Sequence, residues 1–117
     1  MSENKGYNGW ANYETWVVAL WIDNEPGTYE TRREMAQRAW DIAEGTKYWT
    51  RRESAVFGLA HSLRDWVGGE LLPDLGASLA ADLLGAALSE VDWNEIATAW
   101  LDEVDESEEE EEEEEGA

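Results

Sequence analysis

An apolar stretch preceded by a helix-capping residue constrains the fold more than any other part of this sequence. Asn12 can accept hydrogen bonds from the free amides of a first helical turn, and Glu14 is well placed against the helix dipole. The residues that follow are apolar nearly all round a helix, which is typical of a buried helix. We therefore predict that residues 13–23 form the central helix of a small bundle, with Tyr7 and Trp10 folded back onto it.

Apolar spacing also predicts which residues make the core. On the first helix, the inward face is expected to carry Tyr13, Trp16, Val17, Leu20 and Trp21, which recur at helical intervals. Later stretches contribute apolar residues at the same period. The predicted core combines residues from four helices: Trp16, Leu20, Trp21, Trp40, Leu59, Leu63, Trp93 and Trp100.

Caps and breakers predict four further helices. We expect Thr28 to cap a helix that ends near Glu44, and Thr50 to open a capping box for a third helix that Gly68–Gly69 ends. Asp74 is the expected cap of a fourth helix. Asp92 caps the last one, with Glu95 completing a second capping box. Nothing in the sequence indicates a β-hairpin, so the fold class is all-α, a compact bundle of about five helices.

The end of the chain has a different composition. Glutamate fills positions 108–115 without interruption. Because a run of like charges opposes ordered packing, we predict one helical domain over residues 1–105 and a disordered acidic tail over 106–117. A chain of 117 residues is large enough for a single core and too small for two.

Two segments resemble a known group of proteins. The stretch from Tyr7 to Asn24, Y-N-G-W-x-N-Y-E-T-W-x-V-x-L-W-I-D-N, is similar to the opening of small, largely uncharacterised proteins encoded by phages, plasmids and assorted prokaryotes. The segment Asp92–Ala97 is similar to their C-terminal helix. This resemblance implies a mobile-element origin and assigns no catalytic role.

The net charge of the chain limits the classes of molecule that it is expected to bind. Aspartate and glutamate number 28 against 8 lysines and arginines, giving a formal net charge of -20. Phosphate binding relies on clustered basic residues, so neither direct binding to nucleic acid nor binding to an anionic membrane is expected. A basic protein is the expected partner. The sequence has no cysteine and no N-terminal apolar leader, which predicts a soluble cytoplasmic protein, in a host cell if phage-encoded.

The sequence offers little for catalysis. His61 is the only histidine, and no serine lies in a nucleophile elbow. The carboxylates lack the Glu-x-x-His pairs of a di-metal bundle. We therefore predict a protein that is not an enzyme and has neither a cofactor nor a metal site. Most tryptophans fall on predicted inward faces, whereas Trp10 and Trp49 lie outside the helices and are the candidates for an interface. A homodimer is compatible with the sequence.

Rows of carboxylates supply the functional hypothesis. A DNA strand carries one phosphate per about 3.4 Å, and residues four apart on a helix lie about 6 Å apart along its axis, so carboxylates at this spacing form a phosphate-like row. Such an all-α, acidic protein with a poly-acidic end resembles the DNA-mimic antirestriction proteins of phages. The expected partner-binding residues are Glu30, Glu34, Asp41, Glu44, Glu95, Asp102, Glu103, Asp105 and Glu106.

Two alternatives to mimicry stay open. The leading hypothesis is a non-enzymatic inhibitor that occupies the DNA-binding site of a host defence nuclease or similar protein. The first alternative is an acidic accessory or chaperone-like protein that binds basic proteins without mimicry. The second is an acidic surface that serves only solubility, as in a halophilic host.

Overall fold

Helices account for the architecture of the part of the chain that the structure describes, residues 6–104 of the computed structural model. Five α-helices and one π-helical turn follow one another: α1 (Tyr13–Asn24), α2 (Pro26–Ile42), α3 (Arg51–Trp66), η2 (Val67–Leu71), α4 (Leu79–Ser89) and α5 (Trp93–Leu101). The all-α fold class is confirmed. The predicted tail, 106–117, lies outside the described residues, as does the end of the predicted helical domain.

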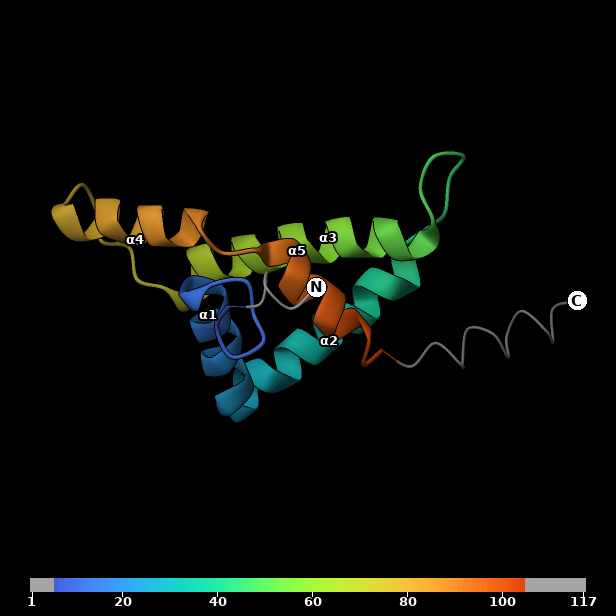
Figure 1. Cartoon of the computed structure of the whole chain (residues 1–117), viewed down its shortest axis with the longest axis horizontal. Helices are drawn as coiled ribbons and strands as arrows, with labels where there is room; N and C mark the ends of the chain where they lie inside the picture. Colours follow the sequence, from blue (N-terminus) through green and yellow to red (C-terminus); the bar gives the residue numbers. More distant parts are fainter. Residues whose placement is uncertain (1–5, 105–117) are drawn as a thin grey trace, which may run out of the picture.

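The organising helix is α3, which corrects the prediction that α1 is central. Helix α3 packs against both α2 and α5, and α1 packs against α2 and α5 at the side of this group (Figure 1). Leu59 and Leu63 of α3 are fully buried, together with Ile96 and Leu101 of α5. The centre of the core is therefore the α3–α5 contact.

The face of α1 that turns inward is not the predicted one. Thr15, Ala19 and Ile22 are its buried residues, whereas Trp21 is 64% exposed and Tyr13 is 50% exposed. The Thr15 hydroxyl accepts a hydrogen bond from the backbone N–H of Asp92 at 2.9 Å. Thr15 on this face thus contacts the start of α5, while Tyr13 and Trp21 lie outside the core. The prediction that Trp21 belongs to the core is wrong.

The other predicted core residues divide into two groups. Leu59, Leu63 and Trp100 are buried, and Trp40 and Trp93 are partly buried against the same cluster. Trp16 and Leu20 are only half-buried on α1. The Trp16 ring lies 5.1 Å from the Tyr7 ring, so Trp16 packs in an aromatic group with Tyr7 and Tyr13 instead of in the central cluster.

A tight turn holds the N-terminal aromatic residues. Tyr7 and Trp10 exchange two backbone hydrogen bonds, of 3.0 and 2.8 Å, across Asn8 and Gly9. Both turn residues have positive φ, 51° and 89°, as a type I′ hairpin turn requires. The predicted fold-back onto α1 is confirmed for Tyr7, whose ring packs against Tyr13 and Trp16. Trp10 packs against the core cluster, and the two-residue turn between them was not predicted.

Three of the predicted caps are confirmed at their positions. Asn12, Thr50 and Asp92 each accept a hydrogen bond from a backbone N–H three residues on, and Thr50 with Glu53 forms the full capping box. The prediction that Thr28 caps the second helix is wrong. Pro26 occupies the first turn, where its missing N–H costs nothing, and Thr28 instead donates its hydroxyl to the Ile22 carbonyl at 2.7 Å.

Two predictions near α4 are also corrected. The pair Gly68–Gly69 does not end the third helix, because the chain continues as the π-helical turn to Leu71. Ser78, not Asp74, caps α4, while the Asp74 carboxylate accepts from the N–H of Gly76 in the preceding loop.

Helix α4 is the least anchored of the helices and lies at one end of the molecule (Figure 1). None of its residues is buried. We expect its amides to exchange with solvent faster than those of α3 and α5, because local opening of α4 exposes little additional apolar surface. Native-state hydrogen exchange measures this directly, and equal protection of α4 and α3 would contradict it.

Candidate functional site

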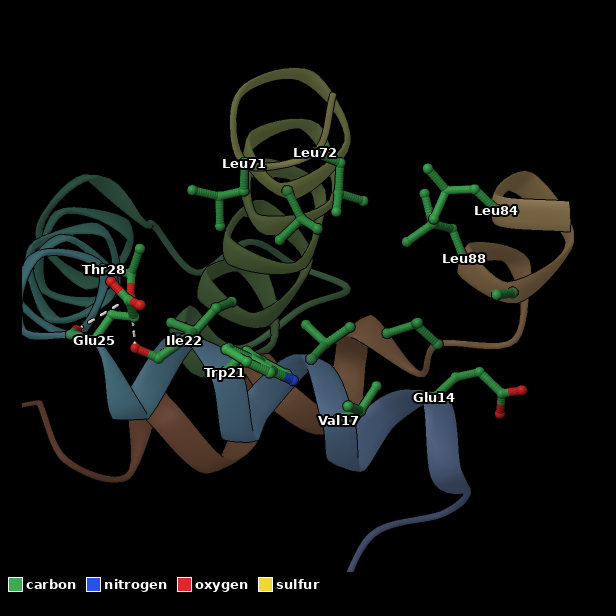
Figure 2. A pocket seen from close by; sticks show the side chains of 14 residues that line it. Glu14, Val17, Trp21, Ile22, Glu25, Thr28, Leu71, Leu72, Leu84 and Leu88 are labelled. Atoms are coloured by element: carbon green, nitrogen blue, oxygen red, sulfur yellow. Dashed lines mark hydrogen bonds between the residues drawn. The ribbon is translucent and has the colours of Figure 1, made fainter. Parts of the chain in front are cut away.

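An apolar groove of about 480 Å³ lies between α1, the π-helical turn and α4. Figure 2 shows α1 along its base, Leu71 and Leu72 on a second side, and Leu84 and Leu88 of α4 on the third. Its lining is mainly aliphatic, with one tryptophan and few polar groups: Glu14, Val17, Val18, Trp21, Ile22, Glu25, Thr28, Val67, Leu71, Leu72, Leu84, Ala87, Leu88 and Val91.

The apolarity of α1 on more than one side explains the base of the groove. Since the Thr15–Ala19–Ile22 face turns toward the core, Val17 and Trp21 are left facing the groove. Val18 and Ile22 lie at the boundary, where they also contact the core. A helix that is apolar all round can in this way serve both the core and a binding surface.

The sides of the groove depend on the irregular chain between α3 and α4. The Leu72 N–H donates to the Val67 carbonyl at 3.1 Å, which closes the π-helical turn and presents Leu71 and Leu72 to the groove. Leu84 and Leu88 extend toward the groove from α4 (Figure 2). The opposite side of α4 is apolar as well, with Leu79 and Leu83 exposed by 75% and 62%.

Carboxylates mark the two ends of the groove. Glu14 and Glu25 lie at opposite ends of α1 in Figure 2. The Thr28 hydroxyl is already committed as a donor to the carbonyls of Ile22 and Glu25. Among residues 6–104, no lysine, arginine or histidine lines the groove. The surface is therefore suited to an apolar group with positive charge at its ends and holds no pair of groups arranged for acid–base chemistry.

Predicted partner-binding residues on α2 share one exposed side of that helix. Glu30, Glu34 and Asp41 are all exposed, and Asp41 accepts a hydrogen bond from the Gln37 side chain at 3.1 Å. Exposed Arg33 and Arg38 lie in the same helix and offset their charge. Glu44 follows the end of α2 and does not continue the row.

Three further predicted site residues, Glu95, Asp102 and Glu103, contact other parts of the protein. Glu95 accepts from the backbone N–H of Ala11 at 3.0 Å, and Glu103 pairs with Arg32 at 2.9 Å. Asp102 pairs with Arg52. Asp105 and Glu106 lie outside the described residues. The structure therefore places the C-terminal carboxylates in separate internal contacts, not in one row with α2.

Arg32 is an important residue that the sequence analysis missed. Its side chain is 3% exposed, donates to Asp23 at 2.8 Å and to Glu103 at 2.9 Å, and lies 4.6 Å from the Trp100 ring. It thus joins α1, α2 and the chain after α5. Arg32 lies three residues after Tyr29 and four before Ala36, on the apolar stripe of α2. This spacing could have indicated from the sequence that its side chain is buried.

Basic residues are confined to one part of the described chain. Every lysine and arginine in residues 6–104 falls between Arg32 and Arg64. Arg51 donates to the Trp40 carbonyl and stacks on the Trp40 ring at 4.0 Å, and Arg32 and Arg52 are in ion pairs. Carboxylates are the only charged side chains on α1, α4, α5 and the π-helical turn. The two charged side chains that line the groove, Glu14 and Glu25, are accordingly both carboxylates.

The other candidate residues lie at the surface or at the core boundary. His61 is 74% exposed and lies 3.3 Å from Asp65, one helical turn away. Trp49 is 48% exposed and packs edge-on against Phe57, whereas Trp10 packs against the core. Within residues 6–104, no three carboxylate or imidazole side chains are grouped so that they could hold a metal ion. Over the same residues, no helix is both long and apolar enough to cross a membrane.

One comparison with known proteins identifies the family. Residues 3–115 match the model of a family of unknown function, DUF7249. The chain belongs to this family. No curated protein and no solved structure matches it. The match covers the α1 motif, the groove and the acidic C-terminal segment, so DUF7249 spans all the features described above and is consistent with the expected uncharacterised family.

Proposed function

We propose that this protein is a non-enzymatic acidic protein that binds a basic protein. The observation that carries the proposal is the separation of charge, since α1, the π-helical turn, α4 and α5 contain no lysine, arginine or histidine. A surface of one sign attracts a partner of the opposite sign and raises the rate of encounter. The groove supplies apolar area within that surface, and an apolar centre with a charged rim is typical of protein interfaces.

Two features favour an accessory protein, which binds a basic protein without imitating DNA, over a DNA mimic. A mimic needs rigid, unpaired carboxylates in a row, but Arg33 and Arg38 interleave the α2 row. Asp102 and Glu103 are in ion pairs with arginines. An apolar groove has no counterpart on a phosphate backbone, whereas a partner protein can fill it.

DNA mimicry is a second candidate function because the sequence after Arg64 carries acidic residues and no basic ones. Its carboxylates continue through the glutamate run at 108–115. Under this candidate the protein inhibits a host DNA-binding protein, such as a defence nuclease, by occupying its DNA site. It would act in the host cytoplasm and come from a phage or another mobile element.

Affinity capture followed by competition tests both candidates. Tagged protein is incubated with a lysate of cells that carry restriction and other defence systems, and retained proteins are identified by mass spectrometry. We expect basic proteins that elute with rising salt, because counterions compete for charged contacts. A control protein of similar acidity and unrelated fold identifies proteins that bind any polyanion. Retention of only neutral or acidic proteins would contradict the proposal.

Charge reversal of the α2 row separates the two candidates. Changing Glu30, Glu34, Asp41 and Glu44 to lysine leaves the buried core untouched, since all four side chains are exposed. Accessory binding through the groove predicts that this variant retains the captured partner and that duplex DNA does not displace the protein. Mimicry predicts loss of the partner and displacement by DNA.

A further inference from the structure

We infer that the α1–α4 groove binds an amphipathic helix of the partner that carries two basic residues about eleven positions apart. This inference rests on the proposed function and names the ligand class of the groove. Glu14, Val17, Val18, Trp21, Ile22 and Glu25 recur at helical intervals along one stripe of α1 and line the groove from end to end. Carboxylates occupy the two ends of this stripe, and apolar side chains occupy its middle.

The dimensions of the stripe fit a helix of about three turns. Glu14 lies in the first turn of α1 and Glu25 is its C-cap, so their separation along the helix axis is about 16 Å at a rise of about 1.5 Å per residue. A partner helix lying along α1 therefore places a base opposite each carboxylate when its basic residues are also about eleven positions apart. Helix-in-groove binding uses apolar anchors at such intervals between the charged ends.

Charge disfavours two segments of this chain as occupants of the groove, α4 of a second copy and the acidic residues after α5. Helix α4 of a second copy offers exposed Leu79 and Leu83, but its only charged residue is Asp82. Residues 105–117 carry acidic side chains and no basic ones. Either segment would bring carboxylates toward Glu14 and Glu25, so a basic helix from another protein is the occupant that complements the groove.

Trp21 is the anchor residue on the protein side. Its indole lies at the base of the groove between Glu14 and Glu25 (Figure 2) and is 64% exposed in the free protein. Large aromatic side chains that become covered on binding dominate interface energetics. Because Trp21 contributes little to the core, its removal changes the groove without unfolding the protein.

A synthetic peptide tests the inference without knowledge of the natural partner. The probe is a helical peptide with lysines at positions i and i+11 and leucines at i+4 and i+7, all on one face. An isomer has the two lysines moved to the opposite face, and a third peptide has serines in place of the leucines. Affinities are measured by fluorescence anisotropy of a labelled peptide at low and physiological salt.

We expect the probe to bind the wild-type protein about tenfold more tightly than either control peptide. Trp21→Ala should weaken binding of the probe by about tenfold or more. The double variant Glu14→Gln/Glu25→Gln should weaken it by about fivefold at low salt. Two matched controls outside the groove, Phe57→Ala and Glu30→Gln/Glu34→Gln, should bind within about twofold of wild type.

Three outcomes would overturn the inference, and they differ in what they mean for the proposed function. Equal binding of the probe and the serine peptide, unaffected by Trp21→Ala, would leave a basic-protein binder that does not use the groove. Failure of all three basic peptides to bind would overturn the groove inference, while the capture experiment would still decide whether the protein binds a basic protein. A wild-type dimer that Trp21→Ala converts to monomer in sedimentation velocity would show that a second copy fills the groove.

Discussion

Replacing Trp100 with alanine should lower the free energy of unfolding by about 3–5 kcal/mol. Trp100 is 2% exposed in α5 and packs within the α3–α5 core, where a smaller side chain leaves a cavity. Its ring also lies beneath the Arg32 guanidinium at 4.6 Å, so the substitution removes a cation–π contact. Urea denaturation followed by circular dichroism measures the change.

Trp21→Ala is the matched control for that experiment. Both changes remove an indole from a helix of the same domain, but Trp21 is 64% exposed. We expect it to change the unfolding free energy by less than about 1 kcal/mol. A larger loss for Trp21→Ala than for Trp100→Ala would mean that α1 faces the core with its aromatic side, and the description of the groove would fail.

The second large effect concerns the buried charge of Arg32. Removing its two carboxylate partners in the variant Asp23→Ala/Glu103→Ala should destabilise the protein by about 3–5 kcal/mol, because a guanidinium that is 3% exposed loses both ion pairs. Arg32→Met should cost less, about 1–3 kcal/mol, since methionine fills part of the space and the freed carboxylates are already 40% and 47% exposed to water.

The order of these two costs is the informative result. Chemical denaturation of both variants at the same pH and salt gives the comparison, and the exposed pair Glu30→Ala/Glu34→Ala on α2 is the control for loss of two surface carboxylates. If Arg32→Met proved the more destabilising change, packing and cation–π contacts of Arg32 would outweigh the cost of leaving its charge unpaired.

Local chemistry was the part of the fold that the sequence predicted best. Asn12, Thr50 and Asp92 cap their helices because a side-chain oxygen needs only the next turn of the same chain to act. The spacing of Leu59 and Leu63 likewise identified the buried side of α3. These features depend on residues close in sequence, so they could be predicted without knowing the tertiary arrangement.

The orientation of α1 could not be predicted in the same way. A helix with apolar residues on nearly every side gives no preferred direction, and the large aromatic residues appeared to mark the buried face. The deciding contacts are distant in sequence, such as the hydrogen bond from Asp92 to Thr15. The Asn8–Gly9 turn, in contrast, had a recognisable signal, since Asn-Gly is the preferred pair for a type I′ turn.

The candidate site was predicted only in its general character. The acidity followed from composition, and the basic partner stays a prediction. The groove depends on how far α4 lies from α1, which no short stretch determines. The α2 row of Glu30, Glu34 and Asp41 was located correctly on one exposed side. Its neighbours Arg33 and Arg38 were visible in the sequence and should have reduced the weight placed on that row.

The salt dependence of partner binding tests the central claim most directly. The captured partner is titrated with wild-type protein by calorimetry at several salt concentrations from low to above physiological. The account predicts that the dissociation constant rises at least about tenfold across this range while a measurable complex persists at high salt, because charged contacts are screened and the apolar groove contact is not. A dissociation constant independent of salt would contradict the claim that this acidic surface recognises a basic protein.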